Sequence, residues 1–427
     1  MRGDFFFFLI LATSACRSST QREASVSSTP SAARERLPVT AATGSVSSPP
    51  RSVAGASVSV PEDASLGRFV LRLEIIPSDD DDFECVPFIS DLAGLADGEA
   101  WVVGSCGLRG RLTETGFVDL AAAWEKKGRT FANQKYSCPA HAAYFAALAR
   151  SPRDVYAVGD TRCGLDPNSI WFRAPERFDG RAWHSLAHQG ARMVPDVLAA
   201  AAAGPVYGLT DRSRDEVRTA PSACAITVLS AGQSRVLRQC RAARHSTDGS
   251  SGEAEHFVSI GVSVSGALWV SGERVTWNGS AERSARLLLR HEKGLWTEQP
   301  FDDMGEIVRA ASGELWLIGA AAWQEHEGAW RKVSLQADLH EASDVCVKSP
   351  NDIWWLGPND TWHFDGENTR RVKSESPDDR SSVMRLEMAG PNLYASSQFK
   401  VWQLVSPSAP APKPITLHLG RAPAALR

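Results

Sequence analysis

One short pattern of apolar and polar positions recurs along most of this chain. An aliphatic or β-branched residue precedes an aromatic one, and two or three small or apolar residues follow, as in AWVVG and IWWLG. A short apolar run bounded by turn residues is typical of a buried strand. We therefore predict a structural strand at each of the seven aromatic residues that share the pattern: Trp101, Tyr156, Tyr207, Trp269, Trp316, Trp354 and Tyr394.

The spacing of these residues predicts the architecture. They lie 38 to 62 residues apart, which is the period of a propeller blade of four short strands with variable loops. A second Trp follows each of several motifs and is expected in a neighbouring strand. In the case of Trp171 it comes after an insertion. A turn with Gly then leads to a third Trp, expected in an outer strand, at Trp183, Trp296 and Trp330. Apolar segments upstream of the motifs are assigned to the innermost strands: 144–148, 256–264, 305–310 and 342–347.

The whole pattern predicts an all-β fold, a single β-propeller of seven four-stranded blades. Six or eight blades are the alternatives, because residues 195–225 carry the pattern poorly. A propeller closes its ring so that no sheet edge stays open. The segment 67–76, in which apolar and polar residues alternate, is expected to close the ring by pairing with the last blade. The other strands of that blade are expected at 384–387, Tyr394 and Trp402, and 414–419 is expected on its outside.

The motif SPRDVYAVGD and the later FDGRAW resemble the repeats of secreted bacterial propellers, near the BNR and Kelch-like class. The resemblance covers roughly residues 85 to 405. It implies the fold, export and a binding role, and it carries no active site over to this chain. The chain lacks the complete Asp-box of sialidases, the Gly-His and Trp-Asp pairing of WD repeats and the double Gly of Kelch repeats.

The N-terminal 62 residues are predicted to lie outside the fold. Residues 1–15 have the layout of a signal peptide, and the run TSAC before Arg17 resembles a lipobox, which implies a lipid on Cys16. Residues 16–62 form a Ser-, Ala- and Pro-rich linker. From Arg17 to Val60, 16 of 44 residues are Ser or Thr and none is aromatic, so we expect disorder. The propeller spans 63–420, and 421–427 is a tail.

Composition narrows the class of partner. The chain has 46 basic and 50 acidic residues and a net charge of -4. A nucleic-acid binder needs a concentrated basic face, so we expect no nucleic acid. We predict that the protein is a monomer and that it contacts a membrane only through its N-terminal lipid.

Eight cysteines in an exported chain predict disulfides. With Cys16 assigned to the lipid, seven remain, and the sequence leaves their connectivity open. If cysteines that follow one another in the sequence form disulfides, Cys346 remains a free thiol, and we expect it to be buried. The candidate pairs are Cys85 with Cys106, Cys138 with Cys163, and Cys224 with Cys240.

No residue is predicted to be catalytic, and no cofactor or metal is expected. The acidic run Ser78 to Glu84 lacks the spacing of a calcium loop, and the four-residue spacing of His184 and His188 would matter on a helix but not at a strand end. No Gly-x-Ser-x-Gly motif occurs. A hydrolytic site, if present, would draw on the insertions 161–169, 211–223 and 241–255. Exposure is predicted for Trp124, Trp296 and Trp355, and packing for the motif aromatics.

These observations together predict an exported, lipid-anchored binding or scaffold module for a protein or glycan at the cell envelope, and no enzyme. The expected location is the outer membrane or cell surface, with a periplasmic or secreted soluble protein as the alternative. The alternative function is a propeller-type glycan hydrolase or lyase with its site in the loops at the mouth of the channel.

Overall fold

The structure is a computed structural model. The described residues are 66–77, 88–105, 107–119, 140–163, 170–172, 174–189, 194–210, 224–230, 232–247, 249–335, 339, 342–357, 360–374 and 385–419. They form β-strands and no α-helix, and none of them builds a helix long and apolar enough to cross a membrane. The predicted signal peptide, linker and C-terminal tail lie outside the described residues.

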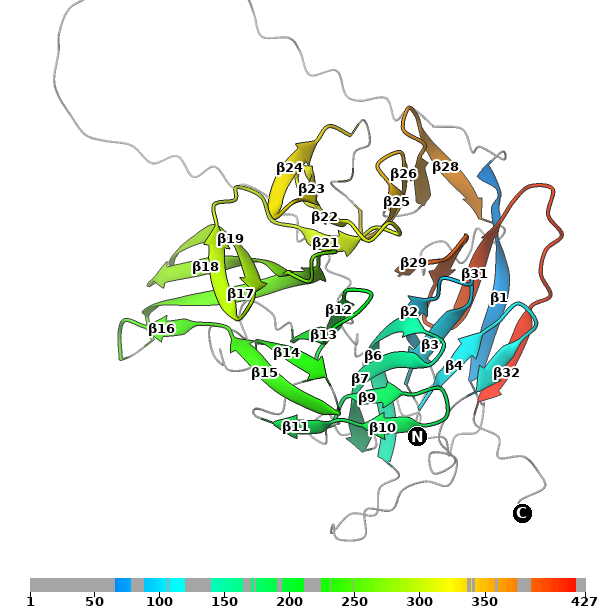
Figure 1. Cartoon of the computed structure of the whole chain (residues 1–427), viewed down its shortest axis with the longest axis horizontal. Helices are drawn as coiled ribbons and strands as arrows, with labels where there is room; N and C mark the ends of the chain where they lie inside the picture. The colour runs from blue at the N-terminus through cyan, green and yellow to red at the C-terminus, as the bar shows by residue number, and fades with distance from the viewer. Residues whose placement is uncertain are drawn as a thin grey trace, which may run out of the picture.

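Most strands fall into seven groups of four main strands, each antiparallel to its neighbours within the group, here called blades 1 to 7 (Figure 1). Blades 1 and 5 are sheets of four strands. From the axis outward, blade 1 contains β2 (Ile89–Gly94), β3 (Ala100–Gly104), β4 (Arg109–Leu112) and β5 (Phe117–Asp119). Blade 5 contains β21 (Glu306–Arg309), β22 (Leu315–Ile318), β23 (Ala322–His326) and β24 (Ala329–Val333).

Blades 2, 3 and 4 each carry one additional strand. Blade 2 contains β6 (Ala140–Ser151), β7 (Asp154–Cys163), β9 (Glu176–Phe178) and β10 (Trp183–Ser185), with β8 (Ile170–Phe172) on β7. Blade 3 contains β12 (Val197–Ala200), β13 (Val206–Thr210), β14 (Ala225–Ser230) and β15 (Gln233–Gln239), with β11 (Ala187–Gln189) on β15. Blade 4 contains β17 (Ser251–Val262), β18 (Leu268–Asn278), β19 (Ala281–Glu292) and β20 (Leu295–Gln299), with β16 (Ala242–Arg244) on β17.

Blades 6 and 7 share one nine-stranded sheet. Blade 6 contains β25 (Asp344–Ser349), β26 (Asp352–Leu356), β27 (Thr361–Phe364) and β28 (Thr369–Ser374). Blade 7 contains β29 (Arg385–Ala389), β30 (Asn392–Ser396), β31 (Lys400–Val405) and β1 (Arg68–Pro77), with β32 (Ile415–Leu419) outside β1. The all-β propeller is confirmed. The number of blades stays a prediction, because β28 and β1 join two of the groups through a short parallel pairing.

The ring is closed by strands from both ends of the folded region. β1 pairs antiparallel with β31, Arg68 opposite Val405, and β32 pairs parallel with β1. The predicted closing strand and the outer C-terminal strand are therefore confirmed. The innermost strands β2, β6, β12, β17, β21, β25 and β29 contact one another in succession around the axis, as Figure 1 shows.

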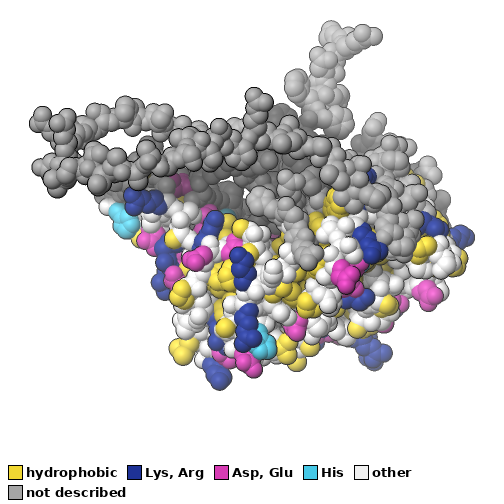
Figure 2. Space-filling model, turned by 90° about the horizontal axis from the view of Figure 1, so that it is seen from above, with side chains coloured by type: hydrophobic (Ala, Val, Ile, Leu, Met, Phe, Trp, Pro, Cys, Tyr) yellow, Lys and Arg dark blue, Asp and Glu magenta, His cyan; other side chains and the backbone are white. Residues whose placement is uncertain are grey.

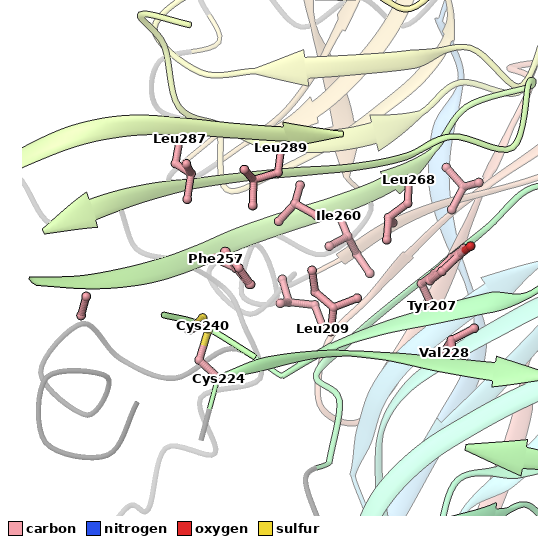
Figure 3. Packing of buried hydrophobic residues seen from close by; sticks show 14 of the residues in the cluster. Tyr207, Leu209, Cys224, Val228, Cys240, Phe257, Ile260, Leu268, Leu287 and Leu289 are labelled. Carbon is pink, nitrogen blue, oxygen red and sulfur yellow. A yellow bond between two sulfur atoms is a disulfide. The ribbon is translucent and has the colours of Figure 1, made fainter. Parts of the chain in front are cut away.

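Apolar side chains fill the space between blades rather than one central core. Buried clusters lie between each blade and the next, all the way round. Figure 3 shows the cluster between blades 3 and 4, where Tyr207 and Leu209 of β13 pack near Phe257 and Ile260 of β17. Because each blade buries both faces of its second strand against the neighbouring blades, that strand is a nearly continuous apolar run.

The two ends of the ring differ in the length of their connections. Connections from the first to the second strand of a blade, such as 95–99 and 152–153, take two to five residues. At the opposite end, the connections from the second to the third strand and from one blade to the next include the much longer 120–139 and 211–224. We call these the turn end and the loop end.

Three details differ from the prediction. In blade 4 the second Trp, Trp277, lies on the same strand as Trp269, β18, and not on a neighbouring one. Trp171 lies on β8, an additional strand on the far part of β7, while β9 supplies the third strand of blade 2. The strand that follows β7 is therefore divided into two segments, β8 and β9, which pair with different parts of β7. Residues 241–255, predicted as an insertion, form β16 and the start of β17.

Candidate functional site

The motif glycine bends the innermost strand next to it. Gly104, Gly159 and Gly272 lie opposite backbone carbonyls so closely that a side chain would overlap them. The innermost strand shifts register at these points in blades 1, 2 and 4, as a β-bulge does. An added Cβ would lie 1.9 Å from the oxygen of Phe88 at Gly104, 1.9 Å from that of Ala143 at Gly159 and 2.3 Å from that of His256 at Gly272.

One position on each innermost strand is equivalent around the ring. It lies two residues before the residue that pairs with the motif aromatic, and we call it the axial position. It is acidic in blades 1, 5 and 6, basic in blade 7 and uncharged in blades 2 to 4. In blade order the residues are Asp91, Ala146, Val197, Ser259, Glu306, Asp344 and Arg385.

Two carboxyls at the axial position accept hydrogen bonds from the backbone of the next blade. Oδ2 of Asp91 accepts a hydrogen bond of 2.9 Å from the amide of Ala147. Oδ2 of Asp344 accepts one of 2.5 Å from Leu386. The innermost strand of a propeller has an open edge toward the axis, so its amides need partners. These carboxyls supply them across the blade interface.

Glu387 performs the same task two residues later on β29. Its Oε1 accepts a hydrogen bond of 2.7 Å from the amide of Gly94 in blade 1. Asp91, Asp344, Glu387 and Arg385 together form what we call the closure cluster, which spans blades 6, 7 and 1. Arg385 acts to lower the pKa of all three carboxyls, and the carboxyl of Asp344 acts to raise the pKa of Asp91 and of Glu387.

Burial makes the carboxyls of the closure cluster weak acids. The pKa of Glu387 is raised to about 8, chiefly by burial and also by the carboxyls of Asp91 and Asp344. Burial raises the pKa of Asp91 to about 6 against the opposing attraction of Arg385. It also raises the pKa of Asp344. Asp91 and Glu387 keep part of their surface exposed, yet the surrounding protein replaces much of the water that would solvate a charge.

A neutral carboxyl near the axis could donate a proton, which is the chemistry of a glycan-cleaving site. Each carboxyl of the closure cluster, however, already accepts a bond from the backbone. Within the described ranges, no group of three or more His, Cys, Asp or Glu side chains could hold a metal ion. The arrangement is therefore suited to joining blades.

The motif aromatics lie inside the blades. All seven are buried, with at most 8% of their surface exposed. In blade 2, Oδ1 of Asp154 lies 2.7 Å from Nε of Arg177, and that guanidinium lies over the ring of Tyr156 at 5.8 Å. Blade 1 has the related ion pair Arg111 with Glu99 at 3.1 Å. The acid of the polar turn thus fixes a side chain opposite the motif aromatic.

Outer-strand Trp residues pack on the motif aromatic of the preceding blade. Trp183 meets Trp101 edge-on at 5.6 Å, and Trp330 meets Trp269 edge-on at 5.5 Å. The predicted exposure of Trp355 is wrong, because it is 4% exposed and packs in the cluster between blades 5 and 6. A doubled aromatic on one strand serves both faces of a blade. Trp296 is partly buried, and Trp124 lies outside the described residues.

Cys224 and Cys240 form a disulfide, with their Cα atoms 5.4 Å apart (Figure 3). Cys346 is buried on β25 as a free thiol. Burial raises its pKa well above the usual range. The candidates Cys85, Cys106 and Cys138 and the lipidation candidate Cys16 lie outside the described residues, and so does the side chain of Cys163.

The remaining polar candidates give no site. His184 lies on the surface, 2.9 Å from Oδ2 of Asp179. The side chain of His188, the acidic run 78–84 and the insertion 211–223 lie outside the described residues. Figure 2 shows Lys and Arg side chains interspersed with Asp and Glu on the visible part of the described surface.

No protein-family model matches this sequence, and no curated protein matches it. Solved structures with a similar arrangement include YCF48 from Cyanidioschyzon merolae, at 14% identity over 74% of this chain and 95% of that chain, with a TM-score of 0.43. An ulvan lyase of a polysaccharide lyase family is similar at 11% identity, over 81% and 96%, with a TM-score of 0.41. The β-propeller domain of the trilobed protease from Pyrococcus furiosus is similar at 7% identity, over 63% and 96%, with a TM-score of 0.32. At these identities none of them identifies the function of this chain.

Proposed function

We propose that this protein is an exported, lipid-anchored β-propeller that binds a protein or glycan partner at the cell envelope through its loop end. The observation that supports the proposal is the difference between the two ends of the ring. Connections within blades at the turn end take two to five residues, whereas 120–139 and 211–224 join strands at the loop end. Long connections on a rigid scaffold are the usual carriers of recognition.

The closing strand β1 determines at which end of the ring the N-terminal segment enters the propeller. β1 starts at the turn end, because Arg68 pairs with Val405 at the end of β31. The chain that precedes β1 therefore joins the ring at its turn end. A lipid on Cys16 would tether the ring through that end and leave the loop end unattached. The proposed protein acts as a monomer in the outer membrane or at the cell surface and binds no nucleic acid.

A pull-down from detergent-solubilised envelope of the producing bacterium tests the proposal. The full-length chain is compared with a variant in which a Gly-Ser linker replaces 211–223. A matched control carries the same linker in the turn 365–368 at the opposite end. We expect one partner to be recovered with the full-length chain and the control and lost with the first variant. Equal recovery with all three chains would place binding elsewhere.

A glycan hydrolase or lyase is the second candidate, favoured by the weakly acidic Glu387 and Asp91 beside Arg385. A screen of envelope and plant polysaccharides with the full-length chain tests it. Cleavage that disappears in Glu387→Gln, combined with no partner in the pull-down, would replace the binding function with this one.

A further inference from the structure

We infer that the closure cluster is a proton-dependent lock on blade 7, which holds the ring closed most tightly in acid and loosens it as the pH rises toward 8. The inference concerns a property of the fold and is independent of which partner the loop end binds. It rests first on where the cluster lies.

Blade 7 is the only described blade built from distant parts of the sequence, since β1 comes from residues 68–77 and the other three main strands from 385–405. A ring of this kind opens where its two chain ends meet. Two carboxyls of the closure cluster bridge the two sides of this blade. Asp344 joins blade 6 to Leu386, and Glu387 joins blade 7 to Gly94 of blade 1.

The next interface carries the third carboxyl, since Asp91 of blade 1 binds Ala147 of blade 2. The same bond between blades 4 and 5 is made by a group that cannot titrate. Oγ of Ser259 accepts a hydrogen bond of 3.0 Å from the amide of Ile307. Among the equivalent positions, Asp344 and Asp91 thus supply titrating acceptors at the interfaces 6–7 and 1–2, and Ser259 supplies a neutral acceptor at the interface 4–5.

The charged and titratable groups around Glu387 are few and mostly acidic. β2 contributes Asp91, β25 contributes Asp344 and the thiol of Cys346, and β29 itself contributes Arg385. Glu306 on β21 acts on the same thiol from one blade further round. When the three carboxyls of the cluster are charged, one guanidinium faces them all.

Proton loss has opposing effects on the amide bonds. A carboxylate accepts a hydrogen bond more strongly than a neutral carboxyl does. The lost solvation and the repulsion between neighbouring carboxylates outweigh this gain, which is what a raised pKa of a buried acid means. The cost of burying the charged carboxylates therefore falls when blade 7 separates from its neighbours and water solvates them.

The direction with pH follows from linkage. The pKa of Glu387 rises from an ordinary 4.5 to about 8, and that of Asp91 rises from 3.8 to about 6. The contribution of each group is complete below its ordinary pKa and is lost as the pH rises through the folded value. The lock therefore weakens between about pH 5 and pH 8.

Hydrogen–deuterium exchange followed by peptide mass spectrometry tests the inference on the full-length chain. Exchange is measured at pH 5 and pH 8, with labelling times scaled to the intrinsic exchange rate. Peptides that contain Gly94 and Leu386 report on the lock, and the peptide that contains Ile307 is the internal control. We expect protection at the first two to fall about tenfold between the two pH values while protection at Ile307 stays constant.

Glu387→Gln keeps an acceptor for the Gly94 amide and removes its titration, so the pH dependence at Gly94 should fall to the smaller part that Asp91 contributes. Glu298→Gln, an exposed change on blade 4, is the matched control and should leave the dependence intact. An equal fall in protection at Ile307 would overturn the inference, and so would a pH dependence at Gly94 that is as large in Glu387→Gln as in the wild-type chain. The comparison of the three wild-type peptides decides the matter even if Glu387→Gln does not fold.

Discussion

Oδ1 of Asp352 lies 2.8 Å from Nε2 of His363 on the neighbouring strand. The same oxygen accepts a hydrogen bond of 2.8 Å from Nε1 of Trp354, and the imidazole stacks on that indole with 4.0 Å between the ring centres. One carboxyl of the polar turn thus fixes both the motif aromatic and the residue opposite it. This explains why an acid stands two residues before the aromatic in several repeats.

Asp352→Ala should lower the free energy of unfolding by about 1 to 3 kcal/mol, because it leaves two polar groups without their acceptor. Urea unfolding followed by Trp fluorescence measures the change. Asp352→Asn keeps one acceptor and should cost less. Glu367→Ala, an exposed change in the same blade, should be close to neutral. A loss as large in Glu367→Ala as in Asp352→Ala would contradict the role given to Asp352.

The motif glycines should not tolerate a methyl group. In Gly104→Ala and Gly159→Ala the new Cβ would lie 1.9 Å from a backbone oxygen of the innermost strand. Backbone cannot move aside as a side chain can, so we expect losses of about 3 kcal/mol, at the upper end of the range for overpacking. Gly116→Ala is the control, because nothing lies within 4 Å of its added Cβ. Urea midpoints of the three variants rank the sites.

The repeat pattern predicted the fold because each motif marks a strand that is buried on both faces. The same reasoning misjudged Trp355, since a doubled aromatic in IWWLG can face two neighbouring blades at once. The closure cluster was not predicted. Asp91 and Asp344 stand at spacings that mean nothing along the chain, and only the register of each innermost strand against its motif aromatic makes them equivalent. Glu387 lies two residues beyond the equivalent position of blade 7, opposite the motif aromatic itself. The sequence contains the motif glycines, but it does not reveal that each is required by a backbone carbonyl that lies close to it across a bulge.

The buried ion pair between blades 1 and 2 predicts a strongly non-additive pair of substitutions. Arg109 is fully buried and bonds to Oε2 of Glu176, which also accepts a hydrogen bond of 2.8 Å from Tyr144. Glu176→Leu alone should cost about 3 to 5 kcal/mol, because a buried charge loses its partner. Adding Arg109→Met should restore much of that stability.

A double-mutant cycle by urea unfolding measures this coupling. The pair of Arg274 with the exposed Glu298 serves as the comparison, since surface pairs contribute at most about 1 kcal/mol. Additive losses from Arg109→Met and Glu176→Leu would show that the two side chains act independently, contrary to the geometry.

The disulfide of Cys224 with Cys240 should stabilise blade 3 measurably. Its sequence separation is 16 residues, and closing a loop of this size stabilises a protein by about 3 kcal/mol. We expect the joint change of both residues to Ala to lower the melting temperature, and non-reducing peptide mapping to recover the linked peptides. Cys346→Ala should leave that linkage unchanged. Recovery of Cys224 linked to a different cysteine would contradict the pairing.

The closure cluster and Asp352 should give the melting temperature opposite dependences on pH. Hydrogen bonds from His363 and Trp354 lower the pKa of Asp352 despite its burial. Its contribution is therefore present above the ordinary value of 3.8 and is lost in stronger acid. The contribution of Glu387 is instead present in acid and is lost as the pH rises toward 8.

Calorimetry of the wild-type chain should accordingly find its highest melting temperature near pH 5, with a fall on either side. Glu387→Gln should flatten the fall toward pH 8 and leave the acid side unchanged, because the amide cannot lose a proton. Asp352→Asn should do the reverse and reduce only the loss in acid. A wild-type melting temperature that rises steadily from pH 5 to pH 8 would mean that other groups outweigh the closure cluster in the stability of the ring.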